Sequence, residues 1–420
     1  MKRRFTGAFV GGLIALCLLV TGCPAPQQPV PPASPQVTAS AVQTTTEATP
    51  SAAPTPAKTP PQGKVKSTPS QQGQKGGKCV DLVICLDTSN SMDALINSAK
   101  QKLWDIVNEV AELKPTPKLR VALISYGNDG YDTQKGWIRI DSDFSTNLDT
   151  INEKLFALHT NGGTEYVTGA VSAALKKLSW TDDKGSLRMV FVAGNEPATQ
   201  DPKITIGNVT SEALQRDVVV NAIYCGAPES GEAQGWRDVA VKGGGSFFAI
   251  NQEAGTVVVN TPYDQQLSQL SGDLNSTYVA YGPQGGAAIM NQAAQDSNSQ
   301  KMSGYAGASR AKAKVSEVYN NKEWDLVDAS KEGSFKLEAV KKQDLPAPMQ
   351  QMNNEEQKKY IEKMAAKRKD LQQQIKDLSA KRDEYIKGQK KTSKTGDSFD
   401  AAVKQSIQDE AVKKGFSTAP

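Results

Sequence analysis

The sequence predicts an α/β fold with a doubly wound, mostly parallel sheet, followed by an α-helical and partly coiled-coil C-terminal region. Three observations carry this prediction. Between residue 79 and about residue 252, segments typical of strands alternate with segments of helical periodicity. The strand-like run at 80–86 is apolar throughout, as expected of a parallel strand covered on both faces. Beyond Pro346, apolar residues recur at spacings of three and four, which is typical of a coiled coil.

The N-terminal segment has the features of an export signal. A basic start at 1–4 is followed by an apolar run at 8–20 and then by Val-Thr-Gly-Cys, which resembles a bacterial lipobox. We therefore expect a lipoprotein signal peptide at 1–22, cleavage before Cys23, and a lipid on the Cys23 thiol. The alternative is an uncleaved anchor with an incidental cysteine. Either interpretation predicts a bacterial cell-envelope protein held at a membrane, facing the periplasm or the exterior.

Residues 23–78 are rich in Pro, Ala, Thr, Ser and Gln. Such a composition buries too little apolar surface to fold, so the segment is predicted to be a disordered stalk. The next segment, 79–275, is predicted to be one α/β domain. Its expected strands are 80–86, 119–126, 137–140 at an edge, 187–193, 218–224 and 246–250, and its expected helices are 92–113, 147–158, 165–178, 208–215 and 261–278.

The C-terminal part divides into an α-rich appended segment at 276–345, a long coiled-coil-like helix at 346–392 and a C-terminal helix and tail at 393–420. The long helix has an a/d heptad pattern with arginine at two of its core positions; the members of the pattern are Ile361, Met364, Arg368, Leu371, Ile375, Leu378, Arg382 and Tyr385. One interpretation is self-association through this helix. The alternatives are an antiparallel hairpin with a second helix at 398–415, or one amphipathic helix lying on the protein.

The first predicted strand is followed directly by Asp87-x-Ser89-x-Ser91. These oxygen-bearing side chains lie on a strand-to-helix loop, and ligands of open α/β sheets bind outside the carboxyl ends of the strands. A carboxylate and two hydroxyls suit hard cations such as Mg²⁺, Mn²⁺ or Ca²⁺ better than zinc or copper. The loop is therefore a candidate metal site.

Further glycine-rich turns follow at Gly162-Gly163-Thr164, Cys225-Gly226 and 243–245. With the Asp-x-Ser-x-Ser loop, they resemble a von Willebrand factor type A domain over about residues 79–275. The segments 80–92, 192–197 and 324–327 resemble more closely a group of bacterial type A domain lipoproteins with helical tails. The alternative is a Rossmann-like domain with an accidental Asp-x-Ser-x-Ser.

The resemblance implies a metal-ion-dependent adhesion site that binds Mg²⁺ or Mn²⁺, with Ca²⁺ as a further candidate. Ser89, Ser91 and Thr164 would coordinate the ion through hydroxyls, and Asp87 would contribute a carboxylate. Because neutral hydroxyls leave the charge of the ion uncompensated, an Asp or Glu of a partner protein can complete the coordination.

One position departs from the family pattern. The family usually has Thr-Asp-Gly after the fourth of the expected strands, and this sequence has Ala193-Gly194-Asn195. The second acidic ligand is therefore missing, and Glu196 replaces it only if the loop turns its side chain inward. Glu165, beside Thr164, is expected in the first turn of a helix near the positive end of the helix dipole, with contact to the site as the alternative.

The sequence favours a binding protein over an enzyme. It contains one histidine, His159, and no Gly-x-Ser-x-Gly, Walker A or dinucleotide-binding motif. The net charge of +4 is modest and gives no indication of nucleic acid binding. We therefore expect a non-catalytic lipoprotein that mediates divalent-metal-dependent protein binding or adhesion. The alternative is a structural or assembly protein of the envelope that acts through its helical tail, with a degenerate metal site.

Overall fold

The computed structural model describes residues 78–250, 258–390 and 399–418. The expected signal peptide, Cys23 and all of the expected stalk except residue 78 lie outside the described residues. Within the described ranges, no helix combines the length and the apolar character needed to cross a membrane.

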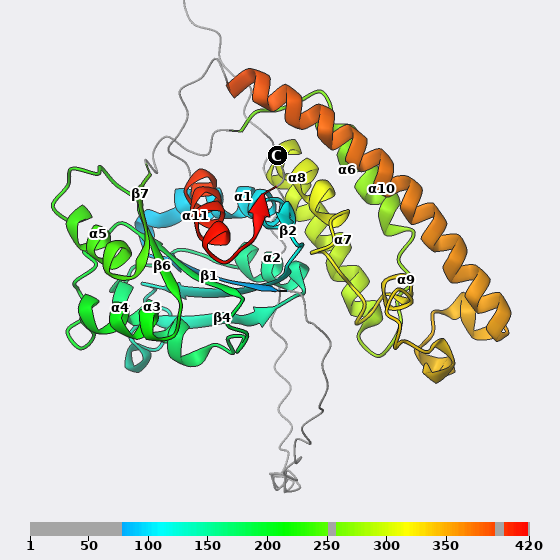
Figure 1. Cartoon of the computed structure of the whole chain (residues 1–420), viewed down its shortest axis with the longest axis horizontal. Helices are drawn as coiled ribbons and strands as arrows, with labels where there is room; N and C mark the ends of the chain where they lie inside the picture. The colour runs from blue at the N-terminus through cyan, green and yellow to red at the C-terminus, as the bar shows by residue number, and fades with distance from the viewer. Residues whose placement is uncertain (1–77, 251–257, 391–398, 419–420) are drawn as a thin grey trace, which may run out of the picture. The chain divides into compact units, whose positions relative to one another are not determined.

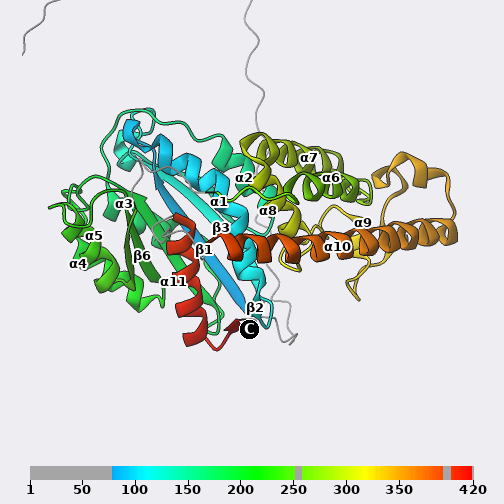
Figure 2. The same ribbon diagram turned by 90° about the horizontal axis from the view of Figure 1, so that it is seen from above.

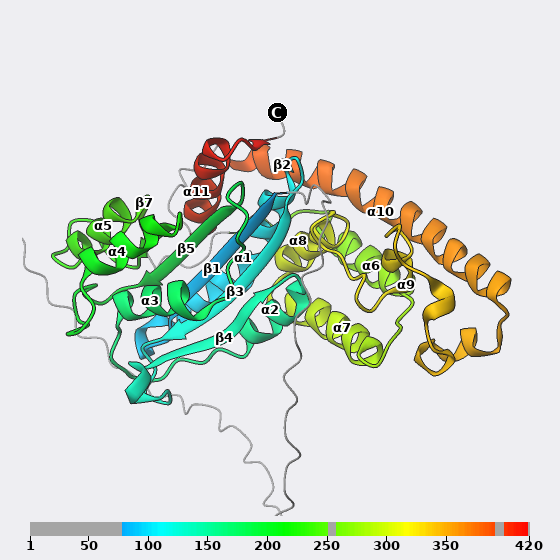
Figure 3. The same ribbon diagram turned by 60° about the horizontal axis from the view of Figure 1, so that its bottom comes forward.

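A six-stranded sheet forms the centre of the α/β domain, with strand order β4-β3-β1-β5-β6-β7 (Figure 3). All neighbouring strands are parallel except β4, which pairs antiparallel with β3 at one edge. The predicted doubly wound, mostly parallel sheet is confirmed, and the predicted edge strand at 137–140 extends further, to residue 145. The strands are β1 (Cys79–Asp87), β3 (Lys118–Tyr126), β4 (Ile138–Ser145), β5 (Leu187–Gly194), β6 (Val219–Tyr224) and β7 (Gly244–Ala249).

The continuous apolar run of β1 is explained by cores on both faces of the sheet. Val80, Leu82 and Ile84 face one core, and Val83 and Cys85 face the other. Helices of the first core include α1 (Asp93–Ala111) and α2 (Leu148–Phe156), and those of the second are α3 (Val167–Lys177), α4 (Ile206–Gln215) and α5 (Ala233–Lys242). Of these helices, α5 was not predicted.

Between the last strand of the sheet and the long helix predicted beyond Pro346, the described residues form α6 (Asp264–Asn275), α7 (Gly285–Met302), α8 (Gly304–Lys314) and α9 (Leu326–Ala329). Buried charges join them to the α/β domain, because the Arg310 guanidinium of α8 lies 2.7 Å from Asp149 of α2 and 2.5 Å from Asp296 of α7. Short 3-10 helices are η1 (Asn90–Met92), η2 (Thr133–Lys135), η4 (Leu337–Ala339), η5 (Lys342–Asp344) and η6 (Ala347–Gln351).

The long predicted helix is α10 (Asn354–Lys390), and it lies against α6, α8 and α9 of the same chain (Figures 1 and 2). Its heptad residues are used inside the chain: Leu371, Ile375 and Leu378 belong to the first core. Both core arginines form buried ion pairs, Arg368 with Asp325 and Asp328, and Arg382 with Asp264. Of the three alternatives, the structure therefore has the amphipathic helix lying on the protein.

The last helix, α11 (Phe399–Lys413), packs against α1 and the strands β5 to β7 and not against α10, so the alternative of a hairpin of the two helices is wrong. Beyond it, β8 (Ser417–Thr418) pairs antiparallel with β2 (Leu113–Lys114). The C-terminal segment thus returns to the α/β domain and covers part of its sheet.

Candidate metal centre

The Asp-x-Ser-x-Ser loop lies at the carboxyl ends of three central strands. Asp87 is the last residue of β1 and is aligned with Tyr126 at the end of β3, while Gly194 ends β5 on the other side. Two hydrogen bonds hold the loop at Ser89 and at the residue before it. Ser89 N–H donates to Asp87 Oδ1 at 2.8 Å, and Asn161 N–H donates to the Thr88 carbonyl at 3.0 Å. The loop therefore lies at the edge of the sheet where the site was predicted.

Asp87 is fully buried, and only one of its carboxylate oxygens is satisfied. Its Oδ2 atom has no hydrogen-bond partner among the described residues. Burial, and then the nearby carboxylates of Glu165 and Glu196, raise the pKa of Asp87 to about 7. A buried carboxylate oxygen without a partner carries a large desolvation cost, which a bound cation would offset.

The two serines of the loop lie close together. Ser89 Oγ is 3.5 Å from Ser91 Oγ, and the Asn195 side chain donates its Nδ2 hydrogen to Ser91 Oγ at 3.0 Å. Asn195 Oδ1 has no partner among the described residues. Ser91 is exposed, so the group is open to solvent on its outer side.

The Gly162-Gly163-Thr164 loop lies against the β3 end because of a glycine that no other residue can replace. Gly163 has φ +140°, and a Cβ there would lie 2.2 Å from the Gly127 carbonyl oxygen. Thr164 follows it and is half-buried. No hydrogen bond joins the Thr164 side chain to Asp87 or to either serine in the described structure.

Glu165 is brought into the site, contrary to the expectation that it belongs to a helix. Helix α3 begins two residues later, at Val167, and Glu165 is only 8% exposed. A Cβ on Gly127 would lie 2.8 Å from Asp87 Oδ1 and 2.9 Å from Glu165 Cγ, so both carboxylate side chains lie over this glycine. Burial and then Glu196 raise the pKa of Glu165, while a hydrogen bond with Ser89 lowers it.

Glu196 is held beside the site by the loop after β5. The Trp236 indole N–H donates to the Glu196 backbone carbonyl at 2.8 Å. The Glu196 carboxylate accepts a hydrogen bond from Gln200 Nε2 at 3.5 Å. The charge of Glu196 acts on both Asp87 and Glu165, raising the pKa of each. The loop therefore brings Glu196 near enough to add negative charge at the position where the sequence lacks an acidic residue.

The donor set fits a hard divalent cation. Across residues 78–250, 258–390 and 399–418, no three or more His, Cys, Asp or Glu side chains are grouped so that they could hold a metal ion by themselves. The expected site, however, takes most of its ligands from hydroxyls. It offers the unpartnered Asp87 Oδ2, the hydroxyls of Ser89 and Ser91, and the charge of two further carboxylates.

Restoring the family's usual aspartate by Gly194→Asp is expected to destabilise the protein by about 1–3 kcal/mol. A Cβ at Gly194 would lie 2.6 Å from the buried Tyr126 hydroxyl and 2.9 Å from Asp87 Oδ2. The new carboxylate would also repel Asp87. Urea denaturation of the two proteins without metal measures the difference. A variant as stable as the wild type would show that the end of β5 has room for an acidic ligand.

The family model described as von Willebrand factor type A domain matches residues 81–258. A search of curated proteins found no match to the chain. Among the solved structures that resemble part of the chain are the following three, each at low similarity.

Proximal thread matrix protein 1 from the mussel byssus is 13% identical, covers 41% of this chain and 42% of its own, and has a TM-score of 0.30. The von Willebrand factor type A protein from Catenulispora acidiphila is 15% identical over 42% of this chain and 40% of its own, with a TM-score of 0.31. The pilus adhesin SpaC from Lactobacillus rhamnosus GG, in its open conformation, is 16% identical over 43% of this chain and 29% of its own, with a TM-score of 0.32.

This chain thus spans less than half the length of each of these three proteins, and the family assignment depends on the family model and on the sheet described above. Residues 81–258 of the chain form a von Willebrand factor type A domain.

Proposed function

We propose that the protein is a non-catalytic lipoprotein of the bacterial cell envelope whose type A domain binds a protein partner through a divalent cation, Mg²⁺ or Mn²⁺, with Ca²⁺ as the alternative ion. The observation that carries the proposal is that the buried Asp87 Oδ2 has no hydrogen-bond partner among the described residues, in the same loop as the paired hydroxyls of Ser89 and Ser91. The envelope location depends on the N-terminal signal and on Cys23.

In this proposal, Asp87, Ser89, Ser91 and Thr164 hold the cation, and Glu165 and Glu196 add negative charge beside it. The bound cation supplies a positive charge at an open position, where a carboxylate of the partner can coordinate it. Ser91 and Asn195 lie at the outer side of the group, so the partner approaches over them. The added charge of Glu165 and Glu196 strengthens cation binding and reduces the remaining attraction for the partner's carboxylate.

The non-catalytic part of the proposal is supported by the kind of domain, because type A domains are typically binding modules. The one histidine of the sequence, His159, makes no hydrogen bond to a nucleophilic side chain in the described structure. Its side chain is exposed, and its backbone carbonyl accepts a hydrogen bond from Asn128 at 3.0 Å. Metal-dependent hydrolysis of a substrate by the purified protein would contradict this part.

Metal binding is tested by isothermal titration of Mn²⁺ and Mg²⁺ into metal-stripped protein that begins at Pro24. The chain must retain residues up to 420, because α10 and α11 contribute to the core. We expect saturable binding that Asp87→Ala abolishes. The matched control is Asp182→Ala, an exposed aspartate on the loop before β5, which should bind metal normally. An absence of saturable binding by the wild type would contradict a working site in the free protein.

Partner binding is tested by the pair Ser89→Ala and Ser91→Ala in one chain. We expect this variant to keep its circular dichroism spectrum and to lose metal-dependent capture of envelope proteins, since the hydroxyl ligands are removed without changing the core. Capture that is equal in the variant and the wild type would reject the proposed function.

The alternative function, assembly through the C-terminal helix, is not favoured by a specific observation. The residues that predicted an intermolecular seam, including Leu371, Ile375 and Arg368, are buried within the same chain. Self-association would have to use another face of α10.

A further inference from the structure

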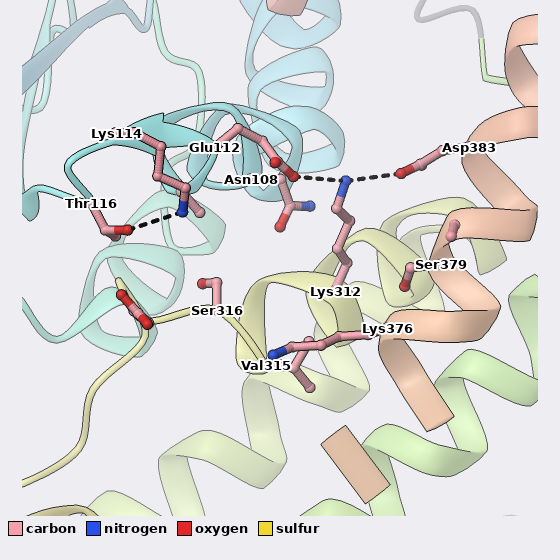
Figure 4. Close-up of a pocket in the computed structure, with 13 residues that line it drawn as sticks. Asn108, Glu112, Lys114, Thr116, Lys312, Val315, Ser316, Lys376, Ser379 and Asp383 are labelled. Atoms are coloured by element: carbon pink, nitrogen blue, oxygen red, sulfur yellow. Dashed lines mark hydrogen bonds and ion pairs between the residues drawn. The ribbon is translucent and has the colours of Figure 1, made fainter. Parts of the chain in front are cut away.

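A second concave site lies where the type A domain meets the C-terminal helices. It has a volume of about 370 Å³ and is lined by the last turn of α1, the β2 segment, α8 and α10 (Figure 4). The metal loop precedes the N-terminal end of α1, whereas this pocket lies at its C-terminal end, roughly 25 Å away at 1.5 Å per residue. The pocket is therefore separate from the proposed metal centre.

On each of two buried polar side chains in the lining, one atom has no hydrogen-bond partner among the described residues. Asn108 of α1 is 8% exposed, and its Nδ2 donates to the Ser309 backbone carbonyl at 3.0 Å. Because a carbonyl can only accept, this bond fixes the orientation of the amide and leaves Oδ1 unpaired. Ser379 of α10 is 3% exposed, and its hydroxyl is also unpaired among the described residues. Such groups are costly unless something binds to them.

The pocket is lined by equal numbers of basic and acidic side chains. One basic and one acidic side chain have neither a hydrogen bond nor an ion pair among the described residues. Lys312 is paired, at 3.4 Å from Glu112 and 2.9 Å from Asp383. Lys376 and Glu317 are exposed, and within the described part of the chain neither has a hydrogen bond or an ion pair. Figure 4 shows the Lys376 side chain extending from α10 toward Val315, the residue after α8.

We propose that this pocket binds a small zwitterionic molecule of amino-acid to dipeptide size. Its ammonium group donates to Asn108 Oδ1 and is balanced by Glu317, and its carboxylate accepts from Lys376 and from the Ser379 hydroxyl. The apolar part of the ligand contacts Val315 and the two alanines of the lining, Ala111 and Ala380. The volume is within the range of small-ligand pockets.

A zwitterion suits the pocket better than a singly charged molecule. The lining contains three lysines and three acidic residues. The pocket therefore has no excess charge that would neutralise a ligand with a net charge. A neutral polyol would satisfy Asn108 and Ser379 but would leave Lys376 and Glu317 unused.

The test is a thermal shift assay of the chain from Pro24 to Pro420 with millimolar L-alanyl-L-alanine. N-acetyl-L-alanine lacks the ammonium group, L-alaninamide lacks the carboxylate, and glucose is a neutral polyol. We expect only the dipeptide to raise the Tm. A Tm raised by none of the four compounds, or raised equally by a capped compound or by glucose, would overturn the proposal.

The position of binding is tested by calorimetric titration of the dipeptide into Ser379→Ala and Lys376→Gln. Each substitution removes a group that has no partner in the free protein, so both variants should fold as the wild type does. We expect each to weaken binding by about tenfold, since one hydrogen bond to a charged ligand group is lost. The matched control Lys369→Gln changes an exposed lysine of α10 outside the pocket and should bind normally. Unchanged affinity in both pocket variants would show that the dipeptide binds elsewhere and would reject the site.

Discussion

Replacement of Arg368 by methionine is expected to lower the free energy of unfolding by about 3–5 kcal/mol. Arg368 is 2% exposed, and its Nη1 lies 2.6 Å from Asp325 Oδ2 and 3.0 Å from Asp328 Oδ1. It also donates to Thr277 through Nε and Nη2, and its guanidinium lies 4.0 Å from the centre of the Tyr278 ring. Methionine keeps helix propensity and much of the volume but leaves buried carboxylates without their cation.

Urea denaturation followed by circular dichroism measures this change. The matched control is Lys359→Met on the same helix. Lys359 and its ion-pair partner Glu355 are both exposed, so losing this pair is expected to cost under about 0.5 kcal/mol. Adding Asp325→Asn to Arg368→Met should recover part of the loss, because it removes the buried charge. A loss as small as that of the control would contradict the buried role of Arg368.

The same arginine shows what the sequence could and could not predict about α10. A period of three and four residues reveals that one face of a helix is buried, but it does not reveal which surface covers that face. An arginine that is buried at a core position needs an acidic group beside it. Those groups are Asp325 and Asp264, which are distant in sequence, so their pairing depends on the tertiary fold.

Helix α5 was missed for a different reason. Gly235 and several polar residues interrupt its sequence, and its buried residues are Ala233, Trp236, Val239 and Ala240. Their spacing fits a helix, but two of the four are alanines, which give a weak hydrophobic signal. The pairing of β8 with β2 was not predictable either, because each segment has two residues and the two segments are far apart in sequence.

The candidate site was predictable where it is local. Asp87, Ser89 and Ser91 follow a strand directly, so their placement required only the strand and its direction. Glu165 was misplaced because its position depends on the path of the loop before α3. That path is set by Gly163 against the Gly127 backbone, a long-range contact whose only sequence signal is the double glycine.

Asp87→Asn is expected to stabilise the metal-free protein by about 2–3 kcal/mol above pH 7, and by progressively less at lower pH. The ordinary pKa of an aspartate is about 3.9 in an unfolded chain, whereas burial raises the pKa of Asp87 to about 7 in the folded protein. The folded state therefore binds a proton more tightly than the unfolded state. As the pH rises through this window the wild type loses stability, and above pH 7 the full cost of the buried charge is present.

Asparagine has no such charge, and its Oδ1 can still accept the Ser89 N–H bond. The value of about 2–3 kcal/mol is below the full charge cost of about 4 kcal/mol because the new Nδ2 would lack an acceptor. Urea denaturation at about pH 5 and about pH 8 with chelator present measures the difference, and Asp182→Asn, at an exposed position, should show no such pH dependence.

Saturating Mn²⁺ should make the wild type more stable than Asp87→Asn. The ion stabilises the ionised Asp87 of the wild type, whereas the variant lacks this carboxylate ligand. Both halves of this prediction depend on the same unpartnered Oδ2 atom. A difference between wild type and Asp87→Asn that is independent of both pH and metal would mean that Asp87 is neither a strained buried carboxylate nor a metal ligand, and the basis of the proposed function would be lost.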